Sequence, residues 1–97
     1  MNRKVILHPA AEEEIFEALD WYAERSALAA RAFVHELSSM VLLARRSPET
    51  WPRAFGEVRR IVFPHYPFQL MFRVKRELVE IVAVAHQRRR PFYWLNR

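Results

Sequence analysis

The chain has 97 residues, the size of one small domain, and we predict a single domain over residues 1–97. Apolar residues make up 52% of the sequence, which is ample material for a hydrophobic core. The absence of cysteine excludes a disulfide framework and thiolate metal or redox chemistry. The four histidines are scattered without zinc-ligand spacing, so we predict no metal and no cofactor.

The start of the sequence lacks the pattern of an export signal. Met1–Lys4 lead into an apolar run of only three residues, Val5–Leu7, before His8 and Pro9. No segment approaches the roughly 18 consecutive apolar residues that a membrane span needs. We therefore expect a soluble cytoplasmic protein that makes no membrane contact.

The net charge of +5 is distributed unevenly along the chain. Residues 1–57 hold seven Lys/Arg against nine Asp/Glu, a balance of −2, whereas residues 58–97 hold nine against two, a balance of +7. This basic C-terminal part favours an acidic partner, either nucleic acid or an acidic protein segment.

The first half of the chain predicts a strand followed by two helices. Residues 3–7 are short and partly β-branched, as in a strand. Pro9 suits the first position of a helix, and Glu12–Glu14 place negative charge near its positive end, where we expect them on a solvated face. Ser26 can cap a second helix that ends at Ser47 and Pro48. The short link between the helices predicts an antiparallel hairpin.

The second half predicts three strands. After a loop over Ser47–Glu57, residues Val58–Phe63 and the alternating Phe68–Val74 have strand patterns. Leu78–Ala85 is almost continuously apolar, which predicts a strand covered on both faces. The expected fold class is α+β, with the order β-α-α-β-β-β and the helix hairpin packed on a small, mostly antiparallel sheet. The basic and aromatic tail, residues 87–97, has no clear pattern.

Several segments resemble the toxins of the RelE/ParE superfamily, often labelled plasmid-stabilisation proteins. The similar segments are Val5–Ile15 with Trp21 and Tyr22, Val58–Arg60 leading to Tyr66–Val74, and, most specific, Val82–Trp94. The last of these resembles the family's terminal strand followed by a His-x-x-Arg-x-Pro-x-x-Trp tail. The resemblance covers essentially the whole chain and favours the ParE branch.

This resemblance implies two alternative activities. RelE-like members are ribosome-dependent ribonucleases that cut mRNA, whereas ParE-like members poison DNA gyrase and are not nucleases. Members of both kinds are neutralised by a cognate antitoxin that wraps over the toxin. They contact operator DNA through the toxin–antitoxin complex.

Metal-free RNA cleavage needs a base, an acid and cations on the phosphate. If the chain is a ribonuclease, its catalytic candidates are His86, Arg59, Arg73 and Tyr93. Histidine is the natural proton carrier near neutral pH, yet a structural hydrogen bond at the strand end is the favoured role of His86. Where RelE-like nucleases carry a phosphate-binding arginine this chain has Gln69, which weakens the nuclease reading.

The tail combines arginines with aromatic side chains, a mixture suited to partner contact. We expect antitoxin or target binding to involve six arginine and aromatic residues of the tail and three arginines of the predicted strands, although Trp94 can instead pack on the core. The residues are Arg59, Arg60, Arg73, Arg88, Arg89, Arg90, Phe92, Tyr93 and Trp94.

The favoured interpretation is a ParE-like toxin that inhibits growth by binding DNA gyrase and is silenced by an antitoxin, and that is not an enzyme. The alternative is a RelE-like endonuclease acting on mRNA at the ribosome through His86 and arginines. A third hypothesis is a non-toxic relic that keeps only antitoxin binding. The sequence leaves these three open.

Overall fold

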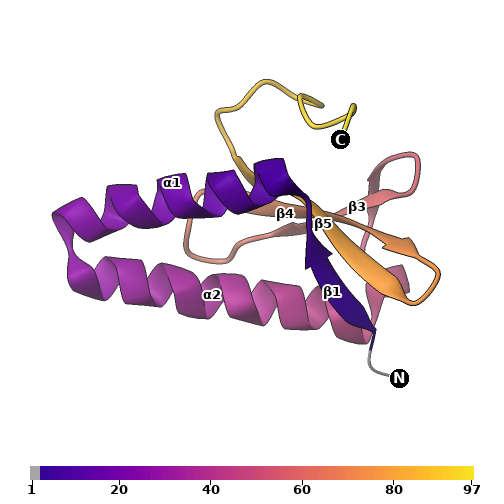
Figure 1. Cartoon of the computed structure of the whole chain (residues 1–97), viewed down its shortest axis with the longest axis horizontal. Coiled ribbons are helices and arrows are strands. Elements are labelled where there is room, and N and C mark those ends of the chain that lie inside the picture. Colours follow the sequence, from indigo (N-terminus) through magenta and orange to yellow (C-terminus); the bar gives the residue numbers. More distant parts are fainter. Residues whose placement is uncertain (1–2) are drawn as a thin grey trace.

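The computed structural model describes residues 3–97 and contains two helices on one side of a five-stranded sheet (Figure 1). The elements follow the order β-α-α-β-β-β-β, which confirms the predicted α+β class and adds one strand. They are β1 (Lys4–Leu7), α1 (Pro9–Arg25), α2 (Ala27–Arg46), the 3-10 turn η1 (Pro48–Thr50), β2 (Arg53–Phe55), β3 (Val58–Val62), β4 (Phe68–Lys75) and β5 (Leu78–His86).

Local capping sets the ends of both helices. Pro9 occupies the first turn of α1, where its missing N–H costs no hydrogen bond, and His8 Nδ1 accepts from the amide of Ala10 at 3.1 Å. Ser26 lies between the helices in an extended conformation, and its hydroxyl accepts from the amide of Ala29. A single residue therefore ends α1 and begins α2, which produces the predicted antiparallel hairpin.

The strands are arranged in the order β1-β5-β4-β3-β2. β1 is parallel to β5 and every other pair is antiparallel, so the sheet is mostly antiparallel, as predicted. β5 lies between two neighbours and is largely buried, which agrees with its continuous apolar sequence. The loop expected over Ser47–Glu57 instead contains η1 and the short edge strand β2, which turns into β3 through Gly56 at a φ of +56°. Three residues are too few for a readable alternation, so this expectation was wrong.

A β-bulge interrupts the pairing of β4 with β5. Phe72 is paired with Ile81 and Met71 with Ala83, so Val82 has no partner of its own. Successive residues of a strand normally face opposite sides of the sheet, and one extra residue reverses this alternation. Odd-numbered residues of β5 therefore face the helices before the bulge, and even-numbered residues face them after it. Val79, Ile81 and Val84 therefore belong to the helix-side core, whereas Val82 and Ala83 face the other way.

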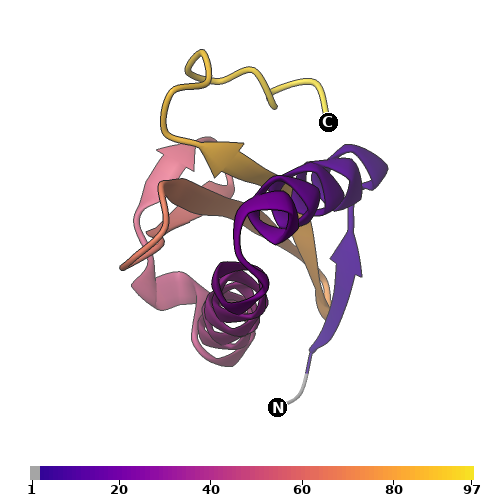
Figure 2. The ribbon, with the colours of Figure 1, turned by 90° about the vertical axis from the view of Figure 1, so that its left-hand side faces the viewer.

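The sheet carries a core on each face. On the helix side, Phe33 of α2 packs with Leu70 and Phe72 of β4, and none of the three has any exposed surface. On the opposite face a smaller cluster gathers around Met71 and Trp94 of the tail. The tail turns back from the end of β5 and runs toward the beginning of α1 (Figures 1 and 2). The tail therefore covers part of the sheet face that the helices do not contact.

Within the described residues, α2 has the length and composition of a possible membrane span. Its buried residues, Ala30, Phe33, Met40 and Ala44, form part of the core beneath α1 and the sheet. The opposite face of α2 also carries exposed apolar side chains, among them Leu28, Val34 and Leu42.

Candidate functional site

The carboxylate of Glu14, in α1, ties the tail to the sheet. It accepts hydrogen bonds from the amide of Val84 at 3.0 Å, the hydroxyl of Tyr93 at 2.6 Å and two nitrogens of Arg97 at 3.0 and 2.9 Å. The Arg97 guanidinium also donates to the carbonyl oxygen of Val82. Beyond Ile81 the edge of β5 has no strand beside it, and these two side chains satisfy backbone groups there.

Glu14 corrects one expectation from the sequence. We placed it on a solvated helix face with Glu12 and Glu13, but its side chain is only 10% exposed. It lies three residues after Ala11 and four before Ala18, both buried. These spacings put it on the inner stripe of α1, a signal that the sequence contained. Arg97, which gave no such signal, was also missed.

Tyr93 is held in a state unsuited to proton transfer. Burial raises the pKa of its phenol strongly, and the hydrogen bond to the Glu14 carboxylate raises it further, because an ionised phenol would face another negative charge. The guanidinium of Arg89 lies over the ring, 3.9 Å from its centroid. The phenol is therefore a protonated structural donor.

Two candidate arginines are engaged inside the domain. Arg73 donates to Glu80 at 2.6 Å and to the backbone oxygen of Arg97 at 2.8 Å. Arg59 donates to the carbonyl of Trp51 at 2.6 Å and holds the segment before β2. Both guanidinium groups support backbone and side-chain structure, although each uses only some of its five N–H donors in these contacts.

His86 ends β5 on the helix side of the sheet, and its ring meets Phe68 edge to face with centroids 5.2 Å apart. Its Nδ1 accepts a hydrogen bond from the amide of Arg88 at 3.0 Å. In the neutral ring the proton is therefore on Nε2, which cannot take up another proton. The geometry resembles an end-of-strand turn cap more than a poised general base.

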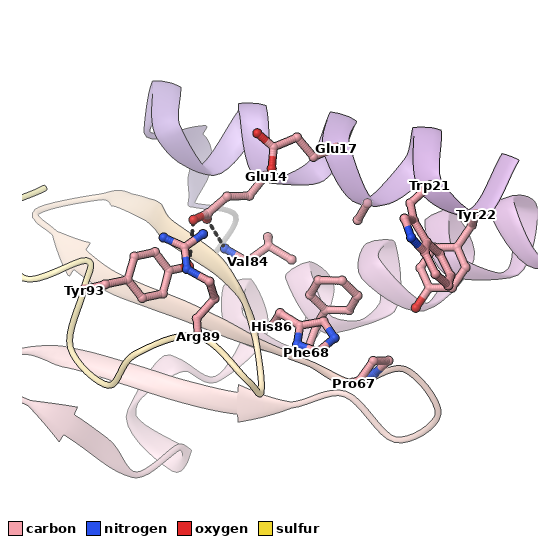
Figure 3. A pocket seen from close by; sticks show the side chains of 11 residues that line it. Glu14, Glu17, Trp21, Tyr22, Pro67, Phe68, Val84, His86, Arg89 and Tyr93 are labelled. Carbon is pink, nitrogen blue, oxygen red and sulfur yellow. Dashed lines mark hydrogen bonds between the residues drawn. The ribbon is translucent and has the colours of Figure 1, made fainter. Parts of the chain in front are cut away.

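A cavity of about 440 Å³ opens between α1, the end of β5 and the tail (Figure 3). Aromatic rings dominate its wall, and Figure 3 shows Trp21 and Tyr22 on one side with His86 and Phe68 below. Arg89 and Tyr93 form the tail side. Of its polar groups, the Glu14 carboxylate and the Tyr93 hydroxyl are bonded to each other, and the Arg89 guanidinium lies over the Tyr93 ring.

A second, smaller cleft of about 170 Å³ lies on the far side of the tail from this cavity. Arg60, Arg89 and Arg90 line it, with Gln69 of β4, and no Asp or Glu is among its lining residues. Gln69 occupies the position where RelE-like nucleases carry an arginine, and in this chain it is surrounded by the three arginines of the cleft. The cleft suits an anionic group.

The remaining residues that we predicted to bind the antitoxin or the target differ in their exposure. Arg60, Arg88, Arg89, Arg90 and Phe92 are exposed, Tyr93 is half-buried, and Trp94 is only 5% exposed within the far-side core. Phe55, which sequence reasoning did not single out, is 57% exposed beside Phe92. No group of three or more metal-ligating side chains comes together in residues 3–97.

The comparisons with known proteins agree with this architecture. Eight chains of known structure match, among them one titled "Chromosomal ParDE TA system from P. aeruginosa", with a TM-score of 0.75 over 87% of this chain and 95% of that one. Their sequences are 18% identical, so this match shows the fold. No curated protein matches.

The family model described as "ParE toxin of type II toxin-antitoxin system, parDE" matches residues 5–91. That range contains β1 from Val5 onward, both helices and all of the remaining sheet. Together with the five-stranded sheet under a helix hairpin, it identifies this chain as a member of the ParE toxin family, a type II toxin of the ParE branch of the RelE/ParE superfamily.

Proposed function

We propose that this protein inhibits growth by binding DNA gyrase in the cytoplasm and that a cognate antitoxin neutralises it. The observation that carries the proposal is the match to the ParE toxin family over residues 5–91. A gyrase poison of this kind acts through contact with its target and requires no proton-transfer residues of its own.

The geometry of the nuclease candidates supports binding over catalysis. Tyr93 is kept protonated beside Glu14, and Arg73 is paired with Glu80. Arg59 is tied to a backbone carbonyl, and the accepting nitrogen of His86 is already occupied. A ribonuclease built from these residues would have to break a structural contact before Tyr93 or the accepting nitrogen of His86 could transfer a proton.

The same geometry limits which of the predicted arginines a partner protein can reach. Of the arginines predicted to contact the antitoxin, Arg60 and the run Arg88–Arg90 are exposed. Together they carry most of the free positive charge of the basic C-terminal part, which favours an acidic segment of the antitoxin. Operator DNA is expected to be bound by the toxin–antitoxin complex and not by this chain alone.

One observation favours the alternative function, a ribosome-dependent mRNA endonuclease. His86 lines the small cleft together with Arg60, Arg89 and Arg90. Three guanidinium groups near an imidazole are chemically suited to a phosphodiester. This alternative requires the His86 ring to release the Arg88 amide before it can accept a proton.

Induced expression separates these functions. Under the gyrase proposal, expression arrests growth with DNA breaks, and the purified protein inhibits supercoiling by gyrase while mRNA stays intact. Cleaved mRNA without DNA damage would instead establish the endonuclease. Normal growth at confirmed protein levels would reject both.

A further inference from the structure

Two exposed aromatic rings meet on the face of the sheet opposite the helices. Phe55 ends β2 and is 57% exposed, and Phe92 lies in the tail and is 47% exposed. Their ring centroids are 5.8 Å apart in an edge-to-face arrangement. Phe55 pairs with Val58, a residue of the far-side core, which places the pair on that face. Contiguous exposed aromatic surface is characteristic of interaction sites.

The backbone at Phe92 is strained, and its ring is partly exposed. Phe92 has a φ of +61°, in the left-handed region that favours glycine. A non-glycine residue there costs on the order of 1–3 kcal/mol. The next two residues hold it in place, because Tyr93 is bonded to Glu14 and Trp94 is buried in the core. The fold therefore keeps a large apolar side chain half-exposed, with its ring against Phe55 and Trp94, at a position where glycine would be easier.

The surroundings of this pair are positively charged. Phe92 shares the wall of the small cleft with Arg60 and Arg90, and no carboxylate lines that cleft. Its volume of about 170 Å³ lies below the roughly 300 Å³ at which small-molecule and cofactor sites begin. It is suited to one acidic side chain, and the rings beside it are suited to one apolar side chain.

We propose that Phe55, Phe92, Arg60 and Arg90 form a docking site for an acidic segment of the antitoxin, which sets an apolar side chain against the two rings and a carboxylate in the arginine-lined cleft. We call these four residues the Phe55–Phe92 surface. The identity of the segment rests on the proposed function, whereas its chemistry rests on the charge and shape of this surface. Apolar contact beside charge-assisted hydrogen bonds is a common pattern for a recognition hot spot.

The test uses the isotope-labelled full chain and short blocked peptides of stated composition. The probe is a peptide of one leucine flanked by two glutamates on each side. The matched controls replace the leucine with serine or the glutamates with lysines, and a single-stranded DNA 12-mer represents nucleic acid. We expect the acidic leucine peptide to shift the amide signals of the Phe55–Phe92 surface and to bind at least tenfold more tightly than either control peptide.

Variants then assign the binding to individual residues. Phe92→Gly keeps the backbone at ease and removes the ring, and Arg60→Glu reverses one charge of the cleft, so we expect each to weaken binding at least tenfold. Leu28→Ser is the control, because Leu28 is 69% exposed on α2, away from this surface. It should bind normally. Should Phe92→Gly lose its fold, Phe55→Ser tests the same apolar contact from the β2 side.

The proposal is overturned if the peptide shifts signals elsewhere, if the variants bind like the wild type, or if the DNA 12-mer binds this surface more tightly than the peptide. Growth arrest and gyrase inhibition are measured separately on the wild-type protein. Peptide binding at this surface without growth arrest would reject the proposed function and keep the docking site. Growth arrest without peptide binding would do the reverse.

Discussion

Glu14 and Arg97 are 83 positions apart and form a two-pronged ion pair, with N–O distances of 3.0 and 2.9 Å. Their side chains are only 10% and 16% exposed. Because the pair sits against the uncovered edge of β5, its removal leaves backbone groups and one charge without partners. The tail is thus an integral part of the domain.

Glu14→Gln should accordingly destabilise the protein strongly. Glutamine keeps the shape but loses the charge, so Arg97 stays largely buried without its counter-ion, and we expect a loss of about 3 kcal/mol in the free energy of unfolding. Chemical denaturation measures it. Glu17→Gln, at an exposed position one turn later on the same helix, is the control and should change stability by less than about 0.5 kcal/mol. Equal stability of the two variants would contradict this role of Glu14.

Phe92 and Trp94 should respond to truncation for different physical reasons. Trp94→Ala empties a space in the far-side core and should cost about 3–5 kcal/mol. Phe92→Gly should be more stable than Phe92→Ala by about 1 kcal/mol, since only glycine is free of strain at a positive φ. Thermal melts of the three variants give both comparisons. If Phe92→Ala were the more stable one, the strained backbone would not be the state in solution.

His86→Gln separates the two toxin mechanisms. Glutamine can still make a hydrogen bond at the strand end but cannot exchange a proton, and a general acid or base typically contributes about 10²- to 10⁴-fold to a rate. Under the gyrase proposal this variant should arrest growth nearly as well as the wild type. Growth curves after induction, at matched protein levels, provide the measurement. Ribosome-stimulated mRNA cleavage that disappears in His86→Gln would establish the endonuclease instead.

Cutting the chain after Arg90 cannot separate the binding role of the tail from its structural role. It removes Phe92, the expected contact, and also Tyr93, Trp94 and Arg97, which hold the fold. We expect the truncated chain to lose its cooperative melt, so its loss of toxicity would report unfolding. Phe92→Gly is the appropriate replacement for this experiment.

Glu36 should make the stability of the protein pH-dependent at the acid end. Burial raises the pKa of its carboxyl, but hydrogen bonds from His65 and from the amide of Tyr66 together lower it below the ordinary value of 4.5. A carboxyl whose pKa is lower in the folded state stabilises the fold above its unfolded pKa, and this contribution is lost as the pH falls through the folded pKa. We expect Glu36→Gln to cost about 1.5–3 kcal/mol at pH 7.

The difference between wild type and Glu36→Gln should therefore shrink as the pH is lowered below 4.5. Urea denaturation at a series of pH values from 7 to 3 gives the comparison. Glu24→Gln, at an exposed position on α1, serves as the matched control. A constant difference across the series would mean that the carboxylate charge of Glu36 does not act through these bonds.

The elements with strong local signals were predictable from the sequence. Pro9 marks the start of α1 through its fixed backbone, and Ser26 marks the start of α2 through its capping hydroxyl. The apolar run of β5 predicts its burial on both faces. β2 was not predictable, because three residues at a sheet edge carry too little pattern. The exposure of the tail residues was equally out of reach, since it depends on which face of the sheet the tail crosses.

The candidate site was predictable only as a set of residue types. The sequence gathers arginines and aromatic residues after β5, but Arg59, Arg73 and Trp94 are used internally while Arg60 and Phe92 remain outside. Such a division follows from contacts between residues far apart in the chain. Helical spacing with Ala11 and Ala18 was the one overlooked local clue, and it concerned Glu14.

The bulge at Val82 makes a single backbone position decide which face of the sheet the His86 ring packs against. With Val82 in place, His86 packs on the face of Phe68, at the boundary between the aromatic cavity under α1 and the small arginine-lined cleft, both of which it lines. Deleting that one residue would turn the last part of β5 over, which would bring the ring to the side of Gln69 and Arg60 and move Ala85 beneath the helices. A one-codon change in strand length can thus take the ring away from Phe68 and place it on the opposite face of the sheet, with no substitution of any side chain.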